Sequence, residues 1–133
     1  AAFRVMGLAT LQLPARLQAV HDMVPACHAV ADVGCEHCLL GISLLLSRRS
    51  HRIIACDASP SSLKRARASM ERYVPPPIGS NIELRLGDGM RPLEPGEVDA
   101  IAIAGIGLPR MHAILFGHTT PAAQRVPTLV LQP

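Results

Sequence analysis

The feature that most constrains the fold is a series of short apolar runs, most of which end in glycine or aspartate. The first run is Val-Ala-Asp-Val-Gly at residues 30–34, and the second ends at Asp57. Continuous apolar runs separated by helical patterns are typical of parallel strands that are buried on both faces. We therefore expect an α/β fold with a mostly parallel sheet and helices on both faces.

Strands and helices are predicted to alternate along the chain. Apolar spacing, prolines and turn residues predict helices over 14–24, 38–48, 60–73 and 109–116. The same reasoning predicts strands over 30–34, 52–57, 82–86, 98–104 and 128–131. The strand over 82–86 alternates apolar and polar residues, so we expect it at the sheet edge. Ser59 followed by Pro60 predicts a capped helix start.

The candidate binding residues follow the strands, because ligands of open parallel sheets bind at the carboxyl ends of the strands. Asp57 comes about as many residues after Gly34 as the acid that accepts hydrogen bonds from both ribose hydroxyls in nucleotide-binding folds. Asp32 and Glu36 would repel a pyrophosphate, but they would suit an ammonium group. S-adenosylmethionine carries adenosine, a sulfonium and an ammonium, and no phosphate. Asp88 is then placed to accept a hydrogen bond from its adenine, while the simpler alternative is that Asp57 only caps the next helix.

These motifs resemble the class I methyltransferases and, most closely, the bacterial tRNA (adenine-22-N1)-methyltransferase family. The resemblance runs from about residue 16 to residue 133 and rests on ADVGCEHCLL, on IELRLGDGM with the later AGIG, and on LVLQP. Leu108 replaces a family glycine, and Cys35 replaces a hydroxyl residue. The resemblance implies a Rossmann-like class I methyltransferase core that forms a single domain over residues 1–133. It also implies that the chain is truncated after the fifth strand and lacks the family's C-terminal strands and helical extension.

The resemblance implies an enzyme that methylates adenine N1 in tRNA with S-adenosyl-L-methionine as cofactor. Glu36 is then a candidate catalytic residue, because a carboxylate stabilises the positive charge that develops on the methylated ring. His37 beside it is a candidate for hydrogen bonding or proton handling, although it could equally tie the loop to the backbone. No metal is expected. The expected cofactor-binding residues are Asp32, Gly34, Cys35, Asp57, Ala58, Ser59, Asp88, Gly89, Ala104 and Gly105.

Two other functions remain open. One is a catalytically inactive methyltransferase-fold module that serves in binding or as a scaffold, which Leu108 and the expected lack of the family's C-terminal part favour. The other is a thioredoxin-like redox protein that uses Cys35 and Cys38, although acids beside these thiols would disfavour a thiolate. A zinc site would require Cys27 or Cys56 as a further ligand. Otherwise we expect the cysteines to be free thiols in the core.

Composition restricts the possible partners and the compartment. Aromatic residues make up only 2% of the 133 residues, which argues against a stacking platform for single-stranded nucleic acid. The net charge of +3 permits a polyanionic partner. The longest apolar stretch, residues 38–46, is about half of a bilayer span, so no membrane partner is expected. We expect a cytoplasmic protein, with an organellar transit remnant in the acid-free first 20 residues as the alternative.

Overall fold

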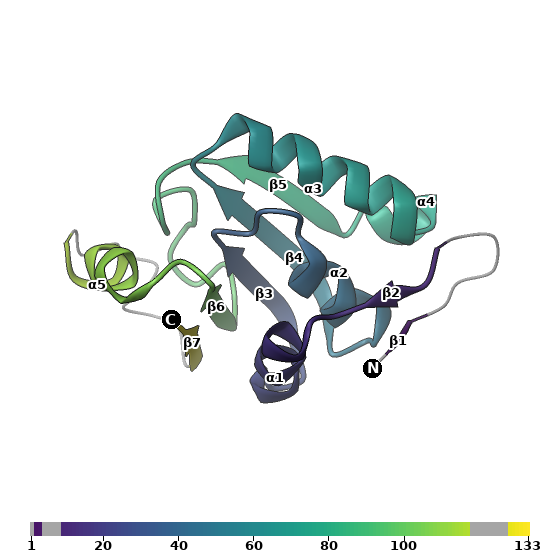
Figure 1. Ribbon diagram of the computed structural model, residues 1–133, viewed down its shortest axis with the longest axis horizontal. Coiled ribbons are helices and arrows are strands. Elements are labelled where there is room, and N and C mark those ends of the chain that lie inside the picture. Colours follow the sequence, from purple (N-terminus) through teal and green to yellow (C-terminus); the bar gives the residue numbers. More distant parts are fainter. Residues whose placement is uncertain (1, 4–8, 118–127) are drawn as a thin grey trace.

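A five-stranded parallel sheet forms the centre of the molecule. The computed structural model describes residues 2–3, 9–117 and 128–133. The strands β3 (Cys27–Val33), β4 (Ser50–Asp57), β5 (Ile82–Leu86), β6 (Ala100–Ala104) and β7 (Thr128–Gln132) are arranged in the order β5-β4-β3-β6-β7. The chain runs outward from β3 to β5 and then returns to the other side of β3, so the strand order reverses between β3 and β6 (Figure 1). Such a reversal is the position at which parallel sheets bind ligands.

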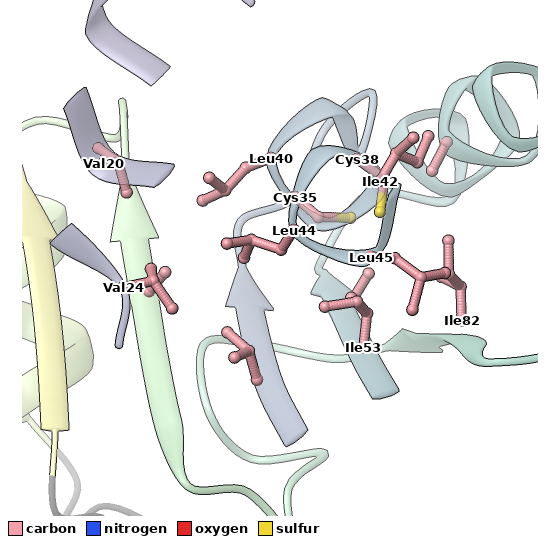
Figure 2. Packing of buried hydrophobic residues seen from close by; sticks show 14 of the residues in the cluster. Val20, Val24, Cys35, Cys38, Leu40, Ile42, Leu44, Leu45, Ile53 and Ile82 are labelled. Carbon is pink, nitrogen blue, oxygen red and sulfur yellow. The ribbon is translucent and has the colours of Figure 1, made fainter. Parts of the chain in front are cut away.

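Three helices cover one face of this sheet. They are α1 (Ala15–Met23), α2 (Leu39–Leu46) and α3 (Pro60–Tyr73), drawn in front of the strands in Figure 1. Figure 2 shows Leu40 and Leu44 of α2 directed toward the side where Val20 and Val24 lie, while Leu45 lies near Ile82. Burial of such side chains stabilises the fold by about 1.5–3 kcal/mol each.

The second face is covered differently. Its buried residues include Ile54, Ile101 and Ile103 of the strands, which pack with Met90, Leu93 and Val98 from the segment between β5 and β6 and with Met111 of α5 (Leu108–Phe116). Alternate residues of each strand therefore face two separate clusters, which requires the near-continuous apolar runs seen in the sequence. The expected parallel sheet with helical cover on both faces is confirmed, although α5 shares the cover of the second face with an irregular segment.

Each predicted helix and strand is present; α3 and β5 have the predicted bounds, and the others differ at one or both ends. β3 begins at Cys27 rather than Val30, because Cys27 already pairs with Ser50 of β4 although the half-buried Cys27 and the exposed His28 are not part of the apolar run. β5 is an edge strand, as predicted, and the Ser59 hydroxyl accepts a hydrogen bond from Ser62 N at 3.4 Å as the expected cap of α3.

Two small elements were not predicted. The short helix α4 (Pro76–Gly79) lies in the expected loop, where prolines at the first helical positions are tolerated. A two-stranded antiparallel pair, β1 (Ala2–Phe3) and β2 (Leu11–Gln12), precedes α1. Of the helices within the described residues, none is both long and apolar enough to cross a membrane.

Candidate functional site

A cavity of about 470 Å³ lies at the carboxyl ends of β3, β4 and β6, where the strand order reverses. Its walls are the turns that follow these three strands, Gly89 of the turn after β5, and residues of α1, α2, α3 and α5. The topology places the cavity there, because the turns on either side of the reversal diverge and leave a crevice. The sequence-predicted residues in its wall are Asp32, Gly34, Cys35, Glu36, His37, Asp57, Ala58, Ser59, Gly89, Ala104 and Gly105.

Asp57 connects the ends of two neighbouring strands. Its Oδ1 accepts a hydrogen bond from Ser59 N at 2.9 Å, and its Oδ2 accepts one from Glu36 N at 3.0 Å. The bond from Ser59 N fixes the start of α3, as expected if Asp57 only caps that helix. The bond from Glu36 N, however, joins Asp57 to the turn after β3. Because each carboxylate oxygen can accept two hydrogen bonds, both oxygens keep acceptor capacity toward the cavity.

The turn after β3 is held in an unusual backbone conformation. Gly34 N and Cys35 N both donate to Cys56 O, at 2.8 and 3.1 Å. Glu36 and Cys38 have positive φ angles of 47° and 58°, a region that side chains other than glycine rarely occupy. Strain of this kind concentrates at functional sites, where the surrounding contacts maintain it.

Asp32 is the buried acid of the site. Its side chain is only 4% exposed, and its Oδ2 accepts a hydrogen bond from Gly41 N at 3.3 Å. Burial, with a smaller contribution from the charge of Asp57, raises the pKa of this carboxyl to about 7, although the hydrogen bond from Gly41 N opposes the shift. A cation bound in the cavity would favour the ionised form of Asp32.

Glu36 and His37 project from the same turn at the rim of the cavity. Both side chains are exposed. Within the described part of the chain, the His37 ring makes no hydrogen bond, so the alternative that it ties the loop to the backbone has no support there. The two groups are available to a ligand in the cavity.

Gly105 closes the opposite wall of the cavity, at the end of β6. Its φ of +74° favours glycine, and a Cβ placed there would lie 3.1 Å from Nη1 of Arg16. Its N–H donates to Gln132 O at 2.9 Å, which fixes the turn to β7. A Cβ at Gly34 would lie 3.1 Å from Cγ2 of Ile106, so the turns after β3 and β6 approach each other closely.

Asp88 is the one predicted site residue outside this cavity. It lines a smaller neighbouring cavity of about 200 Å³, which shares Gly89, Arg110 and Ile114 with the larger one. The two cavities therefore adjoin along α5 and the turn after β5.

Arg16 and Arg110 were not among the residues predicted for the site. Each lies in the first turn of its helix, α1 or α5, and each lines the main cavity. A cation near a helix N-terminus opposes the helix dipole, so its position there was the available signal.

The cysteines are free thiols, as expected. Figure 2 shows the sulfur atoms of Cys35 and Cys38 close together in the core. The hydrogen bond with Cys38, together with burial, raises the pKa of the Cys35 thiol, and burial raises that of Cys56 to about 12. These shifts disfavour a thiolate, so the redox alternative gains no support. Among the described residues, no three His, Cys, Asp or Glu side chains are grouped to hold a metal ion.

Comparisons with known proteins identify similar chains. Residues 13–133 match the family model described as a methyltransferase domain. A tRNA (adenine(22)-N(1))-methyltransferase of Bacillus subtilis is 32% identical, over 92% of this chain and 50% of that protein. The chain thus spans about half the length of this curated relative.

Solved structures show the same similarity. The crystal structure of the B. subtilis m1A22 tRNA methyltransferase TrmK matches with a TM-score of 0.73 and 32% identity, over 80% of this chain and 44% of that one. The structure of M. capricolum TrmK in complex with S-adenosyl-homocysteine matches with a TM-score of 0.71 and 26% identity, over 80% of this chain and 48% of that one. The Rossmann-like fold expected from the sequence is confirmed.

Proposed function

The chain belongs to the methyltransferase-domain family, and from that premise we propose that it binds S-adenosylmethionine and forms the core of an enzyme that methylates adenine N1 in tRNA. The observation that carries the proposal is the pair of carboxylates, Asp32 and Asp57, in a cavity at the reversal of strand order. Similarity to tRNA (adenine(22)-N(1))-methyltransferases supports tRNA as the substrate. We assign residues 1–133 to a single cofactor-binding domain.

The residues in the cavity fit this cofactor. The remaining acceptor capacity of Asp57 suits the two ribose hydroxyls, as in other Rossmann-like folds. Asp32 and Glu36 suit the ammonium group and would repel the pyrophosphate of a dinucleotide. Gly34 and Gly105 keep the two facing turns free of side chains. Because Asp88 lies in the adjoining cavity, we place the adenine on the side where the two cavities meet at Gly89.

The chemistry demands positioning more than proton transfer. The cofactor supplies an electrophilic methyl group, and adenine N1 has a ring lone pair, so the protein must mainly align the two. The methylated ring is cationic, and Glu36 at the cavity rim is placed to stabilise that charge. We assign the neighbouring His37 a hydrogen-bonding role toward the substrate.

A calorimetric titration tests the cofactor site. We expect the 133-residue chain to bind S-adenosylhomocysteine and not NAD. The substitution Asp57→Asn should weaken binding by about tenfold to a hundredfold, because a charge-assisted hydrogen bond contributes about 1.5–3 kcal/mol. The matched control is Asp99→Asn just before β6, at the end of the sheet away from the cavity, where the amide oxygen can still accept the hydrogen bond from Ala29 N. Absence of binding by folded wild-type protein, or equal binding by both variants, would contradict the proposal.

Activity is tested separately with tRNA. The chain is incubated with S-adenosylmethionine and a tRNA that carries adenine at position 22, and the nucleosides are analysed by mass spectrometry. We expect 1-methyladenosine, and none when position 22 is guanine. Cofactor binding without any methylation would favour the alternative of a binding module.

A further inference from the structure

Arg16 occupies a position that folding alone does not explain. It lies in the first turn of α1, where a cation opposes the helix dipole. Its guanidinium makes no ion pair or hydrogen bond with any other residue that the structure describes, yet it lines the main cavity. Its Nη1 and Nη2 lie 3.1 and 3.2 Å from where a Cβ of Gly105 would be. The guanidinium therefore occupies space that the absence of a side chain at Gly105 leaves free.

The cavity has two distinguishable ends. Asp57 marks the end at β4, and Gly105 with Arg16 marks the end at β6, with β3 between them. An elongated ligand whose ribose contacts Asp57 must extend across the turn after β3 toward β6. Its far end then reaches the guanidinium of Arg16.

The cofactor has its charged groups at that far end. Its amino-acid part carries an ammonium, which the acids Asp32 and Glu36 suit, and a carboxylate, which needs a cation. The cavity contains a second arginine, Arg110, but that residue also lines the adjoining cavity together with Gly89 and Ile114. Arg110 is thus on the side where we place the adenine, and Arg16 is the arginine on the side of Gly105.

We propose that Arg16 recognises the α-carboxylate of the cofactor's amino-acid part, and that Gly105 keeps the space in which the guanidinium does so. The planar guanidinium suits this role, because it can donate two parallel hydrogen bonds to a carboxylate. The inference rests on the proposed function, because it assumes the same cofactor in the same cavity.

The test compares two ligands that differ in a single group. S-adenosylmethionine and decarboxylated S-adenosylmethionine share the sulfonium and the ammonium, and only the first has the carboxylate. We expect the wild-type chain to bind S-adenosylmethionine at least tenfold more tightly in calorimetric titrations. Arg16→Gln should remove that preference by weakening only the binding of S-adenosylmethionine. Arg16→Lys should retain part of the preference, because it keeps the charge without the planar fork.

Arg110→Gln is the matched control, since it removes an arginine from the same cavity. We expect this variant to keep the preference for the carboxylate ligand. Circular dichroism establishes that each variant is folded. An equal loss of both ligands in Arg16→Gln, or no preference in the wild-type chain, would overturn the role of Arg16 alone. Binding of neither ligand by folded wild-type chain would instead refute the proposed function and, with it, this inference.

Discussion

At the scale of single residues, the buried Asp32 lowers the unfolding free energy by an amount that depends on pH. Its carboxyl has a pKa raised to about 7 by burial, against 3.8 for the ordinary group. Between these two values the folded chain binds more protons than the unfolded chain, so the contribution of Asp32 to the unfolding free energy falls as pH rises. The slope is at most about 1.4 kcal/mol per pH unit, and above about pH 7 the contribution is constant.

The substitution Asp32→Asn should remove this dependence. The amide oxygen of asparagine can still accept the hydrogen bond from Gly41 N, but the side chain does not ionise. We expect the difference in unfolding free energy, variant minus wild type, to increase by roughly 2–3 kcal/mol when the pH is raised from 5 to 8. Urea denaturation of both proteins at the two pH values measures this difference in unfolding free energy. The contributions of the other titrating groups cancel, because both proteins contain them. A stability difference that is the same at both pH values would show that Asp32 titrates normally.

The residues of the candidate site were predictable to different degrees. Asp32, Gly34, Glu36 and Asp57 could be found because they lie at the ends of strands or just after them, and the carboxyl ends of parallel strands share one side of the sheet. Arg16 could not be placed in the same way, because it comes from a helix. The direction in which a helix presents a side chain to the site depends on tertiary packing.

At the scale of elements, the contact of α2 with β4 depends on Gly41. A Cβ at this position would lie 2.8 Å from Cγ2 of Ile53 and 3.0 Å from Sγ of Cys38. Gly41→Ala would gain up to about 1 kcal/mol from helix propensity, but the overlap with a fully buried isoleucine should cost more. We expect a net loss of about 1–2 kcal/mol in unfolding free energy, measured by urea denaturation.

The control for this prediction is Gly79→Ala in α4. There an added Cβ would meet only Cγ1 of Val74, at 3.9 Å, which is ordinary contact. That variant should be neutral or slightly more stable, because alanine restricts the unfolded chain. Equal effects of the two substitutions would show that α2 moves freely to accommodate a side chain.

The elements themselves were predictable in proportion to their burial. α2 and the central strands are continuous apolar runs, so both their existence and their type follow from the sequence. The start of β3 was not predictable, because the backbone of Cys27 joins the sheet through hydrogen bonding while its side chain is only half-buried. The pair β1 and β2 has two residues in each strand, too few to show a period.

At the scale of the whole molecule, the two faces of the sheet are held in different ways. Helices cover one face, but much of the cover of the other is the irregular segment that contributes Met90, Leu93 and Val98. Arg85 of the edge strand β5 fastens this segment. Its Nη1 donates to Oε2 of Glu97 at 2.7 Å and to the carbonyl oxygen of Pro92 at 2.9 Å.

Removing the charge of Glu97 should therefore loosen the cover of the second face. The hydrogen bond from Arg85 lowers the pKa of Glu97 to about 2 from 4.5, so the stabilisation is complete above about pH 4.5 and is lost as pH falls toward 2. We expect Glu97→Gln to reduce the unfolding free energy by about 1–2 kcal/mol at pH 7, and by much less at pH 2.5.

The matched control is Glu83→Gln, which removes a carboxylate bound to the same arginine. The side chain of Glu83 is 50% exposed against 14% for Glu97, so solvent screens its ion pair and the loss should stay below about 1 kcal/mol. Urea denaturation of the three proteins at pH 7 and pH 2.5 measures both effects. If the two variants lose equal stability at pH 7, the ion pair of Arg85 and Glu97 does not specifically stabilise the segment between β5 and β6. The apolar contacts of Met90, Leu93 and Val98 then hold that segment in place by themselves. If Glu97→Gln loses more and the excess disappears at pH 2.5, the ion pair at the edge strand is what keeps the second face covered.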